Sequence, residues 1–249
     1  MFKRIILTGV GISFCMNVSA VESVEIEDLP LVWSKIITVS GGPSWGTAGQ
    51  NQYLYPLPPP AYNYYTHNAK TSTLANGEIF FGLQRMINPI LTGELGLGVA
   101  GTSNAIVEGF INVNGTPAAY AYQYQVNHVR IELKGKLIAT FSPLVQPYVS
   151  GSFGAGWNHS HDFISTPSNP VLFPQFWLAT ATTVAFPYTL GAGIQTKFTP
   201  NWQVGIGYEF ADLGKSFLGG DGVNLTKGAR LTHLFTNELL FSVSYLFST

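Results

Sequence analysis

The chain has few charged side chains and almost no cysteine. Only 10% of its 249 residues are charged, whereas about 25% is usual for a soluble domain. One cysteine excludes a disulfide framework and a zinc ribbon. The formal net charge of -1 shows no overall basic excess of the kind that binding to nucleic-acid phosphates needs, so we expect no nucleic-acid partner. Hydrophobic residues, at 46% of the chain, are in contrast abundant enough to exclude disorder.

The first twenty residues have the organisation of a secretory signal peptide. Lys3 and Arg4 precede an apolar stretch, and Val18-Ser19-Ala20 is a small-residue cleavage site. The apolar stretch, about 12 residues, is too short for a spanning helix, which needs about 20. We therefore expect a signal peptide at 1–20, a short periplasmic segment at 21–32, and one domain at 33–249.

No later segment has the long uninterrupted apolar run of a spanning helix. Apolar and polar residues alternate instead with a period of two, which indicates β-strands with two different faces. Val129, Ile131 and Leu133, for example, alternate with Arg130 and Glu132. Eight segments show this pattern, at 33–45, 79–87, 91–99, 126–137, 145–157, 188–198, 202–210 and 239–247.

The polar face of these strands is rich in glycine, serine and glutamine and poor in the lysine and glutamate of a water-facing surface. We therefore expect the bulky face to contact lipid and the small face to line a narrow interior. Short turn signals at 88–89, 142–143 and 199–201 alternate with long connections at 46–77, 106–121, 158–184 and 214–230. The prediction is an all-β fold, an eight-stranded antiparallel up-and-down transmembrane β-barrel with short periplasmic turns and long extracellular loops.

Two local features refine this prediction. Asn114-Gly115 lies between two strand-like segments, which favours a two-residue hairpin and strands that project above the membrane. Arg85 falls on the lipid face but lies close to the turn at 88–89, where its side chain can reach the interface.

Several segments resemble small outer-membrane barrels of the opacity-protein and OmpA-like transmembrane type. The similar segments are 147–156, 188–193, 201–202 and 207–214, and the final strand, with Tyr245 and Phe247, is similar to the insertion signal of such proteins. The chain departs from the family pattern by adding Ser248 and Thr249 after that phenylalanine. The resemblance implies the outer membrane of a Gram-negative bacterium, with the barrel assembly machinery as a partner during insertion.

Charged residues on the inward face form the first candidate site. They are Glu78, Glu94, Arg130, Glu132, Lys134, Lys197, Glu209 and Glu238. Unpaired charges would be costly in a narrow interior, so we expect these residues to interlock as pairs. A closed structural plug and a narrow porin-like channel for small solutes remain alternatives.

Aromatic residues in the long connections form the second candidate site, a recognition surface. They are Tyr53, Tyr55, Tyr62, Tyr64, Tyr65, Phe173, Phe176 and Trp177. Such residues suit protein recognition, although aromatics that merely pack over the barrel mouth would show the same pattern. We expect a structural or adhesin-like surface protein whose partners are outer-membrane lipid, lipopolysaccharide and a host or cell-surface protein.

The sequence shows no convincing catalytic constellation, so we expect neither an enzyme nor a cofactor. His159-Ser160-His161-Asp162 suggests a hydrolase, but neighbours in an extended strand point to opposite faces and should not converge. His159 and His161 do share a face, which leaves a weak surface metal site open. A lipid-active outer-membrane enzyme is a further alternative.

Overall fold

The computed structural model describes residues 33–247, except 59, 69, 143–144 and 174. The regular elements of these residues are all strands, and none of the described residues belongs to a helix that could span a membrane. In chain order the strands are β1 (Ser34–Thr47), β2 (Gln52–Leu54), β3 (Asn63–His67), β4 (Thr71–Asn88), β5 (Leu91–Val113), β6 (Thr116–Ala139), β7 (Gln146–Pro167), β8 (Ala181–Ala185), β9 (Tyr188–Lys197), β10 (Trp202–Asp212), β11 (Ser216–Gly219), β12 (Lys227–Leu231) and β13 (Phe235–Leu246). The expected signal peptide and periplasmic segment lie outside the described residues.

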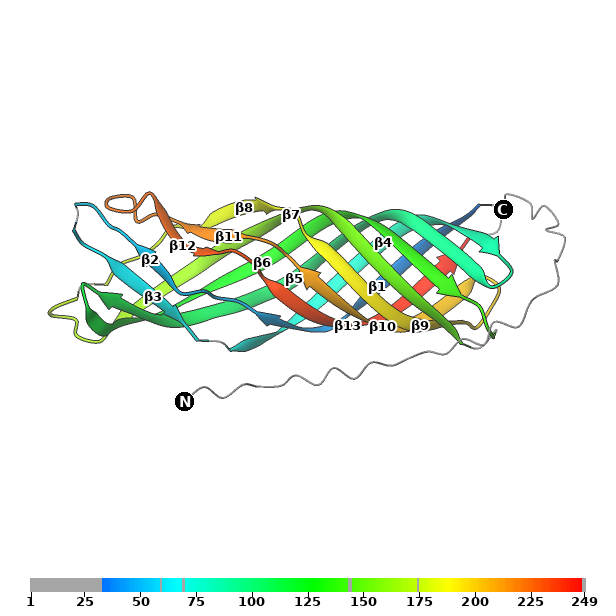
Figure 1. Cartoon of the computed structure of the whole chain (residues 1–249), viewed down its shortest axis with the longest axis horizontal. Coiled ribbons are helices and arrows are strands. Elements are labelled where there is room, and N and C mark those ends of the chain that lie inside the picture. The colour runs from blue at the N-terminus through cyan, green and yellow to red at the C-terminus, as the bar shows by residue number, and fades with distance from the viewer. Residues whose placement is uncertain (1–32, 59, 69, 143–144, 174, 248–249) are drawn as a thin grey trace, which may run out of the picture. The chain divides into compact units, whose positions relative to one another are not determined.

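Eight of these strands form a closed antiparallel ring (Figure 1). Around the ring the order is β1, β4, β5, β6, β7, β9, β10 and β13, and β13 pairs again with β1. Because each strand has a partner on both sides, no sheet edge remains within the ring. The predicted eight-stranded barrel is confirmed, and its strands correspond to the eight alternating segments of the sequence.

One end of the ring has short turns. Asn88 Oδ1 accepts a hydrogen bond from the Ile90 amide at 3.0 Å, and Thr199 Oγ1 accepts one from the Trp202 amide at 3.0 Å. Arg85 lies over the Trp33 ring at this end, 5.5 Å from its centroid. An aromatic and a cation thus stand together where a barrel meets the interface.

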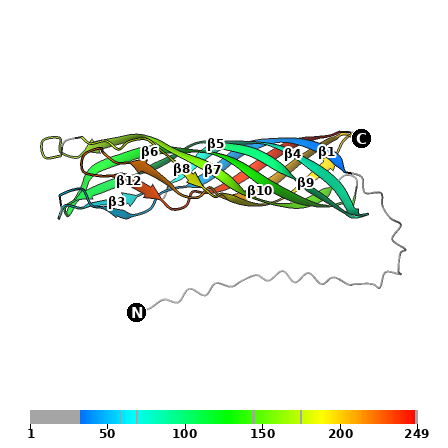
Figure 2. The same ribbon diagram turned by 90° about the horizontal axis from the view of Figure 1, so that it is seen from above.

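At the other end the predicted projection of the strands around 114–115 is confirmed, but part of each expected loop at 46–77, 158–184 and 214–230 also continues as paired strands. β5, β6 and β7 have 23, 24 and 22 residues, whereas β9, β10 and β13 have 10, 11 and 12. Figures 1 and 2 show these long strands running on towards β2, β3 and β12. Asn114 and Gly115 join β5 to β6 with φ values of 46° and 86°, as a two-residue hairpin requires.

Along β6 the polarity of the two faces inverts. In the half of β6 that leads to the short turns, Ile131 points outward with 48% of its surface exposed, while the neighbouring Arg130 points inward and is 2% exposed. Further along β6, towards Asn114, the inward side chains are apolar or aromatic, ending with Val126 at 0%, and the outward residues next to this change are the polar Gln123, Gln125 and Asn127. A bilayer surrounds apolar surface and water surrounds polar surface, so the outer boundary of the membrane crosses β6 near 127–129.

The part beyond this boundary, which we call the extracellular part, has its own apolar core. The residues of this core are buried on the inner face of the extended strands and of the β2–β3 and β11–β12 hairpins beside them. They are Ala48, Tyr65, Leu74, Ala105, Val107, Ile111, Ala119, Tyr120, Tyr122, Tyr124, Val126, Leu178, Ala211, Leu213, Leu218, Leu225, Ala229, Leu231 and Leu234. The same strands therefore have a polar interior where they cross the membrane and an apolar interior, as in a water-soluble barrel, in the extracellular part.

We predict that the two parts respond oppositely to a charge on the outer face of β6. Leu133→Arg should lower the free energy of unfolding in lipid vesicles by about 2–4 kcal/mol, because the new charge faces the bilayer interior. Gln123→Arg, outward on the same strand, should change it by less than about 0.5 kcal/mol. Urea titration of both variants measures the difference, and equal costs would contradict the boundary near 127–129.

Candidate functional site

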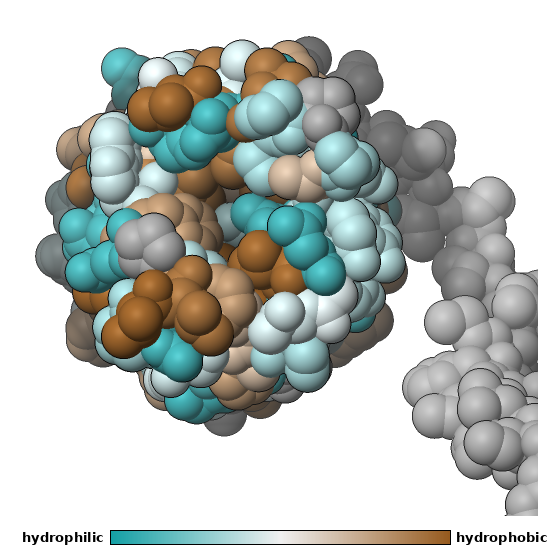
Figure 3. All heavy atoms as spheres, turned by 90° about the vertical axis from the view of Figure 1, so that its left-hand side faces the viewer, coloured by the Kyte–Doolittle hydropathy of each residue, from teal (hydrophilic) through white to brown (hydrophobic). Residues whose placement is uncertain are grey.

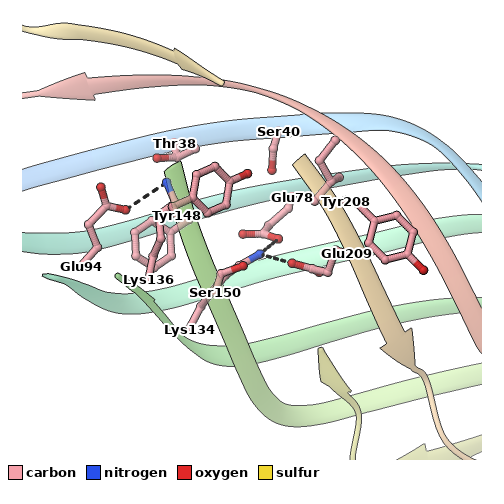
Figure 4. Close-up of a pocket in the computed structure, with 12 residues that line it drawn as sticks. Thr38, Ser40, Glu78, Glu94, Lys134, Lys136, Tyr148, Ser150, Tyr208 and Glu209 are labelled. Atoms are coloured by element: carbon pink, nitrogen blue, oxygen red, sulfur yellow. Dashed lines mark hydrogen bonds and ion pairs between the residues drawn. The ribbon is translucent and has the colours of Figure 1, made fainter. Parts of the chain in front are cut away.

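Three cations from one strand dominate the interior of the membrane-spanning part. Arg130, Lys134 and Lys136 stand on alternate positions of β6, so all three point inward. Lys134 Nζ lies 2.6 Å from Glu78 Oε2 and 2.9 Å from Glu209 Oε2 (Figure 4). Arg130 Nε lies 2.7 Å from Glu132 Oε2, and Arg130 Nη2 lies 3.3 Å from Glu209 Oε1.

These contacts cross the bore. Glu209 is on β10, which is separated from β6 by β7 and β9 around the ring. Its carboxylate nevertheless accepts hydrogen bonds from both Arg130 and Lys134. These hydrogen bonds connect β6 and β10 across the interior, so they tie non-neighbouring parts of the barrel wall together. The same side chains also block the path that a column of water through the barrel would take.

Five carboxylates face three cations in this interior, and polar side chains complete the shell. Glu94 pairs with Lys136 at 3.3 Å and accepts a hydrogen bond from Gln84 Nε2 at 3.0 Å. Glu238 accepts hydrogen bonds from Thr236 Oγ1, at 2.7 Å, and from Asn76 Nδ2. Each of these acids therefore has at least one donor, which low-dielectric burial demands.

The free space left beside this cluster is small. One cavity of about 50 Å³ lies among Glu78, Lys134, Lys136, Tyr148 and Glu209 (Figure 4), which is room for about one or two water molecules. The Tyr148 ring lies under Lys136 Nζ, 4.6 Å from its centroid. Its hydroxyl lies against Gly193 and Gly207, where any side chain would collide with it. Glycine on the inner face thus makes space for Tyr148 within the bore.

A layer of hydrogen-bonded side chains separates the charged cluster from the apolar core of the extracellular part. In this layer His128 Nδ1 lies 2.8 Å from Asn158 Oδ1, and Asn158 Nδ2 donates to the carbonyls of Leu213 and Lys215 at 2.9 and 2.8 Å. Beyond this layer lies the extracellular core, where burial raises the pKa of Tyr122 to about 12. A continuous polar path through the described part of the barrel is therefore interrupted twice, by ion pairs and by hydrocarbon.

The structure brings most of the predicted interior residues together. Glu78, Glu94, Arg130, Glu132, Lys134, Glu209 and Glu238 are all inward and buried or nearly buried. Lys197 is on the inward parity of β9 but stands at its last position, exposed, with no ion pair among the described residues. Lys136 is missing from the predicted set, although the alternation of β6 places it on the same face as Lys134.

The comparison with protein families agrees with this geometry. The model of the outer membrane protein beta-barrel domain matches residues 60–247. The chain belongs to this outer membrane β-barrel family. No curated protein matches its sequence.

The solved structures to which the chain is similar are distant in sequence. Neisserial surface protein A (NspA) is 12% identical, with 86% of this chain and 97% of that chain covered and a TM-score of 0.44. The outer membrane protease OmpT from Escherichia coli is 8% identical, with 86% and 97% covered and a TM-score of 0.48. The outer membrane protein OprG from Pseudomonas aeruginosa is 12% identical, with 87% and 97% covered and a TM-score of 0.42.

The predicted recognition surface of this family member is split between surface and core. Tyr53 lies against Tyr55, Tyr62 and Tyr64, with ring centroids 6.3, 6.1 and 4.5 Å apart, in one partly exposed group that we call the tyrosine patch. The prediction is wrong for Tyr65, because strand alternation turns its side chain inward beside Tyr122 and leaves 0% of its surface exposed.

The third connection needs the same correction. Phe173 and Phe176 pack edge-on against Tyr120, with centroids 5.7 and 4.8 Å away, so they extend the extracellular core and do not form a free surface. Trp177 remains exposed. Apolar residues in a loop are drawn to the nearest apolar core, and here that core lies directly beneath them.

The histidine segment also departs from the expected geometry. His159 and His161 share the outer face, as predicted, and their rings stack with centroids 5.1 Å apart. The expectation that Asp162 points away is wrong, because a positive φ of 54° turns its carboxylate to 3.0 Å from His161 Nδ1. Ser160 points inward and is buried, so the described segment offers this pair no serine nucleophile. No group of three or more metal-ligating residues occurs among the described positions.

We predict that the charged cluster stabilises the barrel. Arg130→Ala should lower the free energy of unfolding by about 3–5 kcal/mol, because it leaves Glu132 buried without its main partner and removes one of the two cations that contact Glu209. Lys197→Ala is the matched control and should cost less than about 1 kcal/mol, since its side chain is exposed. Urea titration in vesicles decides between them, and two equally stable variants would show that the cluster contributes nothing.

The crowding around Tyr148 gives a second prediction. Gly207→Ala should destabilise the barrel by about 1–3 kcal/mol, because the new methyl group meets the Tyr148 hydroxyl. Adding Tyr148→Phe removes that hydroxyl and should recover part of the loss. A double-mutant cycle of unfolding free energies measures this coupling, and purely additive costs would mean that the two residues do not collide.

Proposed function

We propose that this outer membrane β-barrel protein is a surface recognition protein that binds a protein partner through its extracellular end. The observation that carries the proposal is the filled interior. Ion pairs close the membrane-spanning part, and an apolar core fills the extracellular part. An interior without a continuous water path favours a structural role for the lumen and leaves the outer surface to act.

The extracellular end has the exposed apolar residues that a partner would cover. Val171 and Val223 are 91% and 83% exposed, and Leu57 and Leu172 are also largely exposed. Seen end-on, hydrophobic and hydrophilic residues lie side by side on this surface (Figure 3). Exposed apolar groups at loop tips, away from lipid, are costly in water and are typical of protein contacts.

Backbone contacts hold these tips in place. The Leu57 amide donates to the Asn224 carbonyl at 3.1 Å, which ties the first connection to the turn between β11 and β12. Asp221 Oδ1 accepts hydrogen bonds from the amides of Val223 and Asn224 at 2.9 and 2.7 Å. A preorganised surface loses less entropy on binding than a flexible loop, which supports a recognition role.

We also propose that a signal peptide at 1–20 directs export and that the barrel assembly machinery inserts the barrel into the outer membrane of a Gram-negative bacterium. We propose no catalytic activity for the protein. The channel and the lipid-active enzyme are the competing functions.

An attachment assay tests the recognition role. Bacteria that display the chain should adhere to cultured host cells, and the combined variant Leu57→Ser, Leu172→Ser and Val223→Ser should lose most of that adhesion, because the apolar contacts are gone. Ile164→Ser, an exposed apolar position on the side of β7, is the matched control and should adhere normally. Unchanged adhesion of the combined variant at equal surface display would contradict the proposal. Steady single-channel openings of the wild-type protein in planar bilayers would favour the channel.

A further inference from the structure

The extracellular part contains a seam where two sheet edges meet without a backbone ladder. β2 is the edge of the main sheet, and β12 belongs to the separate β11–β12 hairpin. Gln52 uses its side-chain amide to bond both the amide and the carbonyl of Arg230, at 2.9 and 2.8 Å. Gln50 Oε1 accepts hydrogen bonds from the Thr232 amide and hydroxyl at 3.0 and 2.7 Å.

These glutamine side chains hold the two strands further apart than a ladder would. Neighbouring strands in a sheet lie about 4.8 Å apart, whereas an inserted side chain adds its own length. The result is an outward-facing groove of about 480 Å³ along the seam. Its walls include Tyr53 from β2 and Phe217 from β11. We call it the seam groove.

Three cations line the seam groove, and no carboxylate does. They are Lys215, Lys227 and Arg230, all exposed on the outer side of the hairpin, whose alternate residues Ser216 and Leu231 are buried. Lys227 Nζ lies 5.7 Å from the centre of the Phe217 ring. Within the described residues none of the three has an ion-pair partner, whereas Lys70, elsewhere on the extracellular part, pairs with Glu108 at 3.4 Å.

The acidic residues of this region are already engaged. Asp212 Oδ2 lies 2.7 Å from His233 Nδ1, and Asp212 Oδ1 accepts a hydrogen bond from the Gly214 amide at 2.9 Å. Asp221 Oδ1 accepts backbone amides of its own turn, including that of Leu225 at 2.7 Å. The positive charge of the groove is therefore available to an external anion.

The groove begins next to the membrane boundary. Lys215 lies three residues beyond Asp212, the end of β10, which is within roughly 10 Å along a strand. The last outward aromatics of these strands are Phe210 on β10 and Phe235 on β13, whose rings stack with centroids 5.8 Å apart. Polar headgroups extend about 5–8 Å beyond the hydrocarbon, so the lower end of the groove faces the headgroup layer sideways.

We propose that the seam groove binds the phosphorylated saccharide headgroup of an outer-leaflet lipid. Lysine and arginine side chains are suited to phosphate oxygens, and Arg230 offers a fork for bidentate contact. The Tyr53 ring offers an apolar face against which a sugar ring can lie, with a polar edge towards water. Basic pockets at the membrane surface are the general means by which proteins hold anionic headgroups. This site is separate from the loop tips of the proposed protein contact and does not depend on it.

A binding experiment with the full-length protein in neutral phosphatidylcholine nanodiscs tests the site. The probe is purified lipopolysaccharide, native or chemically dephosphorylated, at low salt. The combined variant Lys215→Ala, Lys227→Ala and Arg230→Ala should bind native lipopolysaccharide at least about tenfold more weakly, because charge-assisted contacts are lost. The wild-type protein should bind the dephosphorylated form as weakly as the variant binds the native form.

Controls separate this site from a general charge effect and from misfolding. Lys70→Ala removes a cation outside the groove and should leave binding unchanged, and Arg230→Lys keeps the charge and should retain most of it. Gln52 bonds only the backbone of Arg230, so the seam should persist in the variants, and a heat-dependent gel shift checks that their barrels are folded. Equal binding by wild type and combined variant, or equal binding of both lipopolysaccharide forms, would overturn the proposal. Binding of soluble heparin without binding of lipopolysaccharide would overturn the lipid source.

Discussion

The structure depends on the absence of water in the bilayer core, which leaves backbone amides and carbonyls no partner outside the protein. A closed antiparallel ring satisfies all of them, and eight strands are enough to close it. A closed ring of eight strands has a narrow interior, and this limits which side chains can point into it. Glycines admit Tyr148, and charges such as Arg130 and Glu209 stay buried because they meet across the bore.

The same strands continue beyond the bilayer into water, where polar residues are needed on the outer face and apolar residues on the inner face. Tyr124 and Val126 then turn inward into an apolar core, two to four residues from His128 on the same strand face. One set of strands thus meets two solvents with two opposite patterns. The extracellular part gains rigidity from this arrangement, because its base is the barrel wall itself, and rigid surfaces bind with less loss of entropy.

The extracellular part presents two surfaces of different chemistry. Its distal tips, with Val171 and Val223, are apolar and suit a protein contact, whereas the seam groove is basic and lies beside the headgroup layer. The seam arises because the short hairpin of β11 and β12 cannot extend the main ladder and is joined to β2 through glutamine side chains. Membrane anchoring and partner recognition can therefore occupy separate regions of one small protein.

Local sequence determined which residues face which side, since strand alternation has a period of two and needs no distant contact. It predicted the eight strands, the hairpin at Asn114-Gly115 and the inward direction of Glu78, Arg130 and Glu209. Tertiary structure decided the rest. The stagger between strands sets the height of each residue in the bore, so Lys136 meets Glu94 while Lys197 remains outside the cluster. The burial of Tyr65 and the seam between Gln52 and Arg230 also depend on segments far apart in the chain, because only closure of the extracellular part brings them together.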